Sequence, residues 1–279
     1  MMRGIVVSPK YVIDGNNIRF PGLLGIEDFD LRRYLMYWDK IDYPNSNMID
    51  IVSSPDILYL EEVGVLKRTG INVSGDFRLD ELYPMGQLQV FNLKNALEPG
   101  SWSLAQSTPK LNLLKKDTEK TRVLEVELYQ CLPVPTENVS LDEILEFKQR
   151  RNSELLEFRF LMDKLYLDTI ESGDFERAKT HNIELLQKKI FDIDRLMGES
   201  RFNRVKTNLS TNISISDLVV ESLKGFTAGA FIGMPEWGAL AGFASSFIKL
   251  DLGISSKPKG LPEGIKDYAY LYHAKKELG

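Results

Sequence analysis

The first residues of the chain follow a β-type pattern of short apolar runs. Residues 4–8 (GIVVS) form one such run, and residues 11–20 form a second. Gly15 and Asn16 lie at the centre of the second run and tolerate the positive φ that a tight turn needs. We therefore predict a short strand followed by a β-hairpin.

Helical spacing replaces this pattern after residue 27. Asp28 or Asp30 can cap a helix that reaches about Ile41. The predicted helix has an apolar stripe, because its large hydrophobic residues recur every three or four positions. This stripe consists of Leu31, Tyr34, Leu35, Trp38 and Ile41.

Strand-like and helical segments continue to alternate up to residue 135. A serine cap, a proline at the first helical position and an acid near the helix dipole predict a helix that begins at Ser54-Pro55-Asp56. Gly64 ends this helix. The other predicted elements are strands over 48–53, 65–73, 102–106 and 123–132, a helix within 79–97, and a turn at residues 98–100. Such alternation favours an α/β layer with a mixed, partly parallel sheet.

Long helices are predicted after residue 135. Ser140 and Glu143 form a capping box, and the helix that they begin continues to about Glu171. Gly173 ends it, and a second helix continues to about residue 197. Because very few residues join the two helices, we expect a long antiparallel hairpin. Its predicted facing residues are Leu155, Phe158, Met162, Leu165 and Tyr166 on the first helix and Ile183, Leu186, Ile190, Ile193 and Met197 on the second.

A glycine-rich apolar run occupies residues 225–248. Its small residues recur every fourth position, and on a helix they form a seam where another backbone can approach closely. They are Gly225, Gly229 and Gly233 in one half and Gly238, Gly242 and Ser246 in the other. Pro235 breaks the run, so two short helices are expected. Three interpretations stay open: a buried core, a seam for self-association, and conditional contact with a membrane.

These patterns divide the chain into three parts. Residues 1–135 form the α/β subdomain, residues 136–200 the helical hairpin, and residues 201–279 a glycine-rich helical closure that packs on the hairpin. The predicted fold class is α/β or α+β. Within the third part, residues 265–278 form a final amphipathic segment.

Composition narrows the class of protein. The 279 residues carry a net charge of -5 and a sequence pI near 5.3, which gives no strong nucleic-acid signal. The single cysteine, Cys131, has no partner for an internal disulfide, so a reducing compartment is expected. The first apolar run is too short for a signal peptide. The predicted location is the cytoplasm.

Few catalytic chemistries fit the residue inventory. His181 and His273 are the only histidines, and with one cysteine they do not suffice for a typical zinc site, so no metal and no cofactor are predicted. There is no phosphate-binding glycine loop and no nucleophile elbow. We expect His181 at the surface and Cys131 as a small buried apolar residue.

Carboxylates offer the one enzymatic alternative. Glu125 and Glu127 lie two apart on a predicted strand, so both would point to one face of the sheet. Asp56 and Asp76 follow strand-like runs, where α/β sheets often bind ligands. Together they could hold Mg²⁺ for phosphodiester or nuclease chemistry. Solvated surface acids and helix caps are the simpler interpretation.

Two sequence blocks carry a family resemblance. Residues 33–44 (RYLMYWDKIDYP), followed by residues 56–66 (DILYLEEVGVL), resemble the N-terminal half of an uncharacterised bacterial domain-of-unknown-function family. Residues 144–165 (ILEFKQRRNSELLEFRFLMDKL), with the later glycine-rich run, resemble its C-terminal half. The resemblance identifies no catalytic residue. It implies a bacterial accessory-genome protein with a role in antiviral defence or a toxin-like system.

The leading hypothesis is a non-enzymatic interaction protein. Its partner would be another protein or a second copy of the chain, and its helical half would mediate assembly. The alternatives are the carboxylate nuclease and a membrane-acting effector that uses the glycine-rich run.

Overall fold

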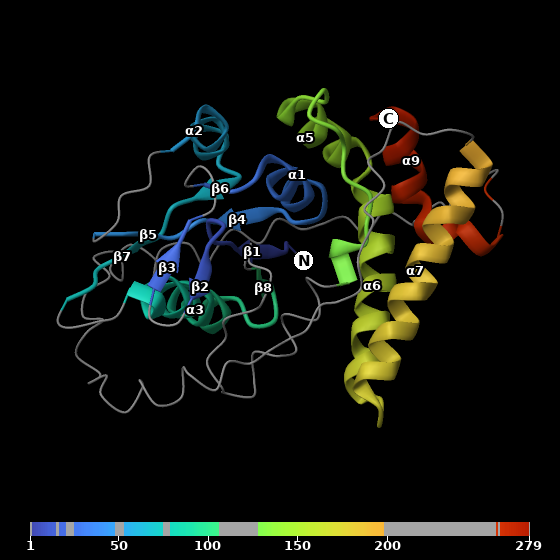
Figure 1. Cartoon of the computed structure of the whole chain (residues 1–279). Coiled ribbons are helices and arrows are strands. Elements are labelled where there is room, and N and C mark those ends of the chain that lie inside the picture. The colour runs from blue at the N-terminus through green and yellow to red at the C-terminus, as the bar shows by residue number, and fades with distance from the viewer. Residues whose placement is uncertain are drawn as a thin grey trace.

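A computed structural model gives the structure of the chain. It describes residues 2–14, 17–20, 25–47, 53–74, 79–105, 128–197, 261 and 263–278. The described part has the predicted α/β class, with a parallel sheet in the N-terminal half and a set of packed helices in the C-terminal half (Figure 1).

The main sheet has four short strands in the order β6-β4-β1-β8, and every neighbouring pair is parallel. The strands are β1 (Gly4–Val6), β4 (Lys40–Asp42), β6 (Leu66–Lys67) and β8 (Trp102–Leu104). Beyond β4 and β6 the chain continues into a smaller parallel pair, β5 (Asn45–Ser46) with β7 (Gly70–Ile71). The predicted strand over 65–73 is therefore two strands in two different sheets.

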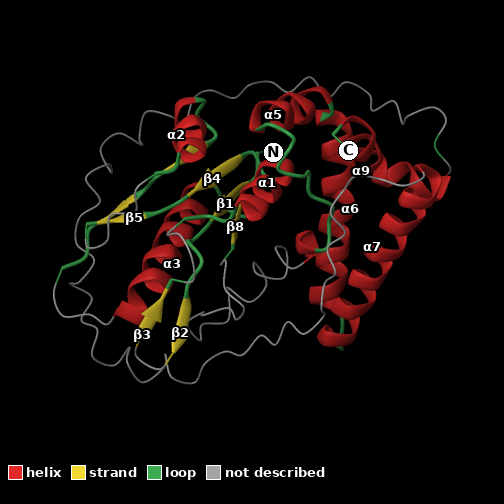
Figure 2. Ribbon diagram, turned by 45° about the horizontal axis from the view of Figure 1, so that its top comes forward, coloured by secondary structure: helices red, strands yellow, loops and turns green. Residues whose placement is uncertain are grey.

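The predicted hairpin is confirmed. β2 (Val12–Asp14) pairs antiparallel with β3 (Asn17–Arg19), with Asp14 opposite Asn17. This hairpin follows β1 and lies beside the helix α3 (Leu79–Leu97) (Figure 2).

Helices cover both faces of the sheet. α1 (Asp28–Tyr37) and α2 (Pro55–Glu62) connect strands in one direction across the sheet, from β1 to β4 and from β4 to β6. The connection through α3 returns in the other direction, from β6 to β8. Because parallel crossovers are right-handed, this reversal puts α3 on the opposite face (Figure 1).

α1 is the most deeply buried helix of the described chain. Every residue from Leu31 to Trp38 is buried, including Arg32 and Arg33. The helix lies between the sheet on one side and α5 (Leu141–Arg150) on the other. Leu31, Tyr34 and Leu35 of the predicted stripe are buried on α1, but the stripe is too narrow, because two layers pack on this helix.

The end predicted for this helix is wrong. α1 stops at Tyr37, Trp38 takes an extended conformation, and Ile41 lies on β4. Ile41 is buried, but it faces the core from a strand. Apolar spacing alone cannot separate the last turn of a buried helix from the buried strand that follows it. The predicted aspartate cap is also wrong, since Glu27 occupies the N-cap and makes no side-chain cap bond.

α3 covers a small core of its own. Val6, Val90, Phe91, Trp102 and Leu104 belong to it. Gly4 permits the close approach of β8, because a Cβ at this position would overlap the indole ring of Trp102. The mid-helix Pro84 does not end α3, which starts upstream of it at Leu79.

The helical half contains the expected antiparallel hairpin. α6 (Asn152–Glu171) packs on α7 (Phe175–Met197), and η3 (Glu263–Tyr268) and α9 (Ala269–Glu277) pack on both. Asn182 fixes the hairpin by donating to the carbonyl of Leu165 at 3.1 Å and to Oγ1 of Thr169 at 2.8 Å. Of the predicted facing residues, the fully buried ones are Leu155, Phe158, Met162, Leu165, Ile183, Leu186 and Ile193.

The first long helix is interrupted where we predicted continuity. α5 ends at Arg150, and Arg151 departs from helical geometry before α6 begins. The side chain of Arg151 pairs with Glu154 and with Glu277 on α9. The interruption lets α5 pack on α1 while α6 packs on α7 and α9. No glycine or proline marks it in the sequence.

The predicted strand over 123–132 is wrong in its described portion. Residues 128–130 are helical, and Cys131 and Leu132 follow in a turn. Leu128, Tyr129 and Leu132 are buried all the same. A short apolar run fits a buried helical turn as well as a strand, and periodicity does not distinguish them. Residues 123–127 lie outside the described part, as do residues 48–52 of the strand predicted over 48–53.

Candidate functional site

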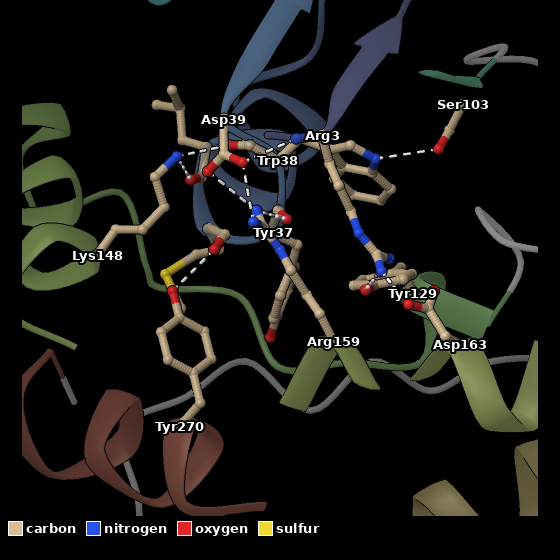
Figure 3. Close-up of polar contacts among 12 residues, drawn as sticks. Arg3, Tyr37, Trp38, Asp39, Ser103, Tyr129, Lys148, Arg159, Asp163 and Tyr270 are labelled. Atoms are coloured by element: carbon tan, nitrogen blue, oxygen red, sulfur yellow. Dashed lines mark hydrogen bonds and ion pairs between the residues drawn. The ribbon is translucent and has the colours of Figure 1, made fainter. Parts of the chain in front are cut away.

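The strongest concentration of buried polar contacts lies where the helical half meets the amino edge of the sheet (Figure 3). Arg3 precedes β1 and Asp39 precedes β4, and the parallel pairing of these strands places the two residues together. The backbone N–H of Asp39 donates to the carbonyl of Arg3 at 2.8 Å. In return, the N–H of Arg3 donates to Oδ2 of Asp39 at 2.8 Å. We call this region the junction.

Asp39 and Arg159 form its central ion pair. Both terminal nitrogens of Arg159, on α6, donate to the Asp39 carboxylate, at 2.8 and 3.0 Å. One of them also donates to the carbonyl of Tyr37 at 2.8 Å. Burial alone would raise the pKa of Asp39, but the hydrogen bonds and charge of Arg159 outweigh it and hold that pKa below its ordinary value. The pair therefore stays ionised and joins α6 to the end of α1.

A second pair extends the junction along α6. The guanidinium of Arg3 pairs with Asp163, which lies one turn beyond Arg159. It also donates to the Tyr129 hydroxyl at 3.5 Å. Arg3 thus connects the first strand of the sheet to both α6 and the helical residues 128–130.

Lys148, on α5, caps the carboxyl end of α1. Its ammonium donates to the carbonyls of Leu35 at 2.9 Å and Trp38 at 2.5 Å. Carbonyls at this end of a helix lack intrahelical donors, and the helix dipole favours a cation there. Burial nevertheless lowers the pKa of Lys148 to about 8. This lysine therefore ties α5 to α1.

Aromatic side chains fill the space around these charges. The Tyr129 ring lies 4.7 Å from the Trp38 ring and 5.5 Å from the Tyr37 ring, between centroids. Two buried tyrosine hydroxyls donate to backbone carbonyls. That of Tyr37 donates to Pro133 at 2.7 Å, and that of Tyr270, on α9, donates to Met36 at 2.8 Å. Burial raises the pKa of Tyr37 and of Tyr270 well above the ordinary tyrosine value. Both phenols are therefore neutral hydrogen-bond donors at physiological pH.

A separate polar group ties α3 to the sheet. Asp42, at the end of β4, is completely buried; it accepts from Oγ1 of Thr69 at 2.6 Å and pairs with Lys94 of α3 at 2.8 Å. Gln87, also on α3, donates to the carbonyls of Val6 and Ala105 at the ends of β1 and β8. The carboxyl ends of β1 and β8 are where the strand order reverses, a place where open α/β sheets bind ligands. Here Gln87 bridges the two strands.

Of the four predicted carboxylates, only Asp56 lies within the described residues. Asp56 is exposed in the first turn of α2, beside Ser54, whose hydroxyl accepts from the N–H of Ile57. Glu125, Glu127 and Asp76 lie outside the described residues. Within the described residues no group of three histidine, cysteine, aspartate or glutamate side chains is arranged to hold a metal ion.

Of the other residues singled out in the sequence, the structure describes some and leaves others outside the described part. His181 is exposed on α7, as expected. Cys131 is buried, and burial raises the pKa of its thiol to about 12, so the thiolate is not populated at neutral pH. The glycine-rich seam lies outside the described residues: Gly225, Gly229, Gly233, Gly238, Gly242 and Ser246. None of the helices that the structure describes combines the length and apolarity needed to cross a bilayer.

A comparison with known protein families identifies the family to which the chain belongs. A model of a family of unknown function, DUF6236, matches residues 17–279. The chain belongs to DUF6236. The resemblance of the two sequence blocks to a domain-of-unknown-function family is therefore confirmed. No match to this DUF6236 chain was found among curated proteins or among solved structures.

The two blocks that carry the resemblance meet at the junction. Asp39 comes from the 33–44 block, and Lys148 and Arg159 come from the 144–165 block. The sequence pattern did not predict these contacts, because the partners are far apart along the chain and share no spacing rule. No spacing signal could have found them, because Lys148 and Arg159 lie on helices with many other charged residues. In this DUF6236 chain the junction can hold two layers in a fixed arrangement.

Proposed function

We propose that this chain is a non-enzymatic, cytoplasmic interaction protein whose helical half mediates assembly. The observation that carries the proposal is the exposure of large apolar side chains on the hairpin, while its other face is buried. Phe160 and Leu167 on α6 are 67% and 50% exposed, and Phe191 on α7 is 60% exposed. Exposed apolar groups of this size on a well-packed scaffold are typical of interaction surfaces.

The junction supports the same proposal. Arg159, Lys148 and Asp163 engage the α/β layer with the inner side of the helical half, so the outer side of the hairpin faces away from it. The buried charges and phenols of the junction pair with one another or with backbone carbonyls and serve as structural ties. A rigid base of this kind pre-organises a binding surface and lowers the entropic cost of binding.

The proposal includes the glycine-rich run of residues 225–248, because of its small-residue spacing and its place next to the helical half in the sequence. In the sequence the run lies between α7 and η3, two elements that pack together in the helical half. We propose the six small residues of the run as contact positions, with a protein or a second copy of the chain as partner. The setting implied by the family resemblance is bacterial antiviral defence or a toxin-like system.

One set of assays tests the class of function. The purified full chain is incubated with DNA and RNA in Mg²⁺ or Mn²⁺, alongside Glu125→Ala. We expect no cleavage. Metal-dependent cleavage that the substitution abolishes would overturn the interaction proposal in favour of a nuclease.

A second set tests the contact positions. We expect Gly229→Leu and Gly242→Leu to change the assembly mass measured by light scattering after gel filtration. Gly173→Leu is the matched control, because no atom lies within 4 Å of a Cβ at Gly173. Unchanged mass in both test variants counts against these positions. Flotation of the wild type with liposomes, lost in both variants, would instead support a membrane effector.

A further inference from the structure

The outer face of α6 carries a narrow stripe of apolar and charged residues. At helical spacing the stripe comprises Glu157, Phe160, Lys164, Leu167 and Glu171. They fall within about 80° of one another at 3.6 residues per turn. The other face of the helix is buried through Leu155, Phe158, Met162, Leu165 and Thr169. Packing inside the described chain therefore occupies one side of α6 only.

Two opposite charges of this stripe lie at similar distances on either side of Leu167. Lys164 lies three positions before it and Glu171 four positions after it. Within the part of the chain that the structure describes, neither Lys164 nor Glu171 makes an ion pair. In an antiparallel pair of α6 helices with a twofold axis beside Leu167, each Lys164 lies opposite Glu171 of the other copy. The same pairing then occurs twice, and the two Leu167 side chains meet at the axis.

From this pattern we infer that a second copy of this chain docks on the outer face of α6, with the two α6 helices antiparallel. The inference rests on the proposed function and names one surface for it. A twofold interface must be complementary to itself, and the sequence Lys164-Leu167-Glu171 has this property in the antiparallel orientation. In the parallel orientation like charges would face each other. Phe160 flanks the axis on each side and adds apolar area.

Charge reversal tests both the surface and its orientation. Sedimentation velocity over a dilution series gives the dimer Kd of the full chain. Lys164→Glu or Glu171→Lys alone turns two attractive pairs into two repulsive ones, so each should raise the Kd on the order of tenfold at low salt. The double variant restores both pairs with reversed sign, so it should return the Kd to the wild-type value. Leu167→Lys should abolish the dimer.

Two matched variants control for general effects. Lys188→Glu and Leu58→Ser alter an exposed charge on α7 and an exposed apolar side chain on α2, and they should leave the Kd unchanged. Circular dichroism spectra should show that all variants keep their helix content. A monomeric wild type, a single reversal without effect, or a double reversal that fails to restore the dimer would each overturn the inference. If the α6 variants leave the mass unchanged while Gly229→Leu alters it, this surface is wrong and the proposed function stands.

Discussion

Single residues at the junction show how buried charges define the arrangement of two layers. Arg159 is almost completely buried, and its partner Asp39 retains one-fifth of its side-chain exposure. Bringing such charges out of water is costly, and their attraction compensates only when the geometry and the remaining hydrogen bonds are good. Here Asp39 accepts three hydrogen bonds, from Arg3 and Arg159. The pair therefore favours one particular docking of α6 on the sheet.

Removing one partner of this pair should be strongly destabilising. We expect Arg159→Met to lower the free energy of unfolding by about 3 kcal/mol, because Asp39 is left charged and partly buried without its main donor. Urea denaturation followed by circular dichroism measures the change. Arg150→Met is the control: its side chain is 57% exposed, and we expect a loss of at most about 1 kcal/mol.

A double-mutant cycle then assigns the effect to the pair. Adding Asp39→Asn to Arg159→Met should cost less than the sum of the two single losses, because the unpaired charge is gone. Strict additivity would mean that the two side chains act independently and that the pair does not hold the layers together.

At the scale of elements, the side-chain caps of α2 and α5 were easier to predict than the environment of α1. The capping box of α5 is present as predicted: the N–H of Ser140 donates to Glu143 at 2.8 Å, and the N–H of Glu143 donates to the Ser140 hydroxyl at 3.2 Å. The cap of α2 is also present, but its bond to Ser54 is long, at 3.4 Å. Both signals are local in sequence. The burial of α1 on two sides is not, because α5 is far away along the chain.

The two caps should differ in strength. We expect Ser140→Ala to lower the free energy of unfolding by about 1 kcal/mol, since it removes one bond and disrupts a reciprocal pair. Ser54→Ala should cost less, because its single bond is longer. Paired urea titrations measure both changes. An equal or larger loss at Ser54 would contradict this ranking.

At the scale of the whole molecule, buried titratable groups from several elements set the dependence of stability on pH. Burial lowers the pKa of Lys148 on α5 and of Lys275 on α9 to about 8. In the unfolded chain a lysine titrates near pH 10.4. Between these values the unfolded state binds more protons than the folded state, so stability rises with pH. Above about pH 10 the raised pKa values of Tyr37 and Tyr270 reverse this trend, because the unfolded phenols ionise first.

We therefore expect the chain to be more stable at pH 9.5 than at pH 8, by on the order of 1 kcal/mol. Urea denaturation at half-unit steps of pH measures the profile. Lys148→Met should be less stable overall, since the α1 carbonyls lose a donor, but its profile should be flatter in this interval. A profile of unchanged slope in Lys148→Met would show that this lysine does not cause the rise.

Local patterns predicted most of the elements, and they failed where tertiary contacts decided the outcome. Residues 128–130 form a helical turn in place of a strand, and α5 and α6 separate at Arg151 without any glycine or proline. The candidate site also depends on tertiary contacts. Asp39, Lys148 and Arg159 carry no motif, so the sequence pattern could not select them from other charged residues.

The sequence by itself determined the α/β class, the β-hairpin, the caps of α2 and α5 and the antiparallel pairing of α6 with α7, because each depends on residues that are close along the chain. Only the tertiary structure decided the strand order, the double-sided burial of α1 and the junction of Arg3, Asp39, Lys148 and Arg159. These features depend on packing and electrostatic contacts between segments that are distant along the chain. The spacing of residues within one segment does not predict the free energy of such contacts.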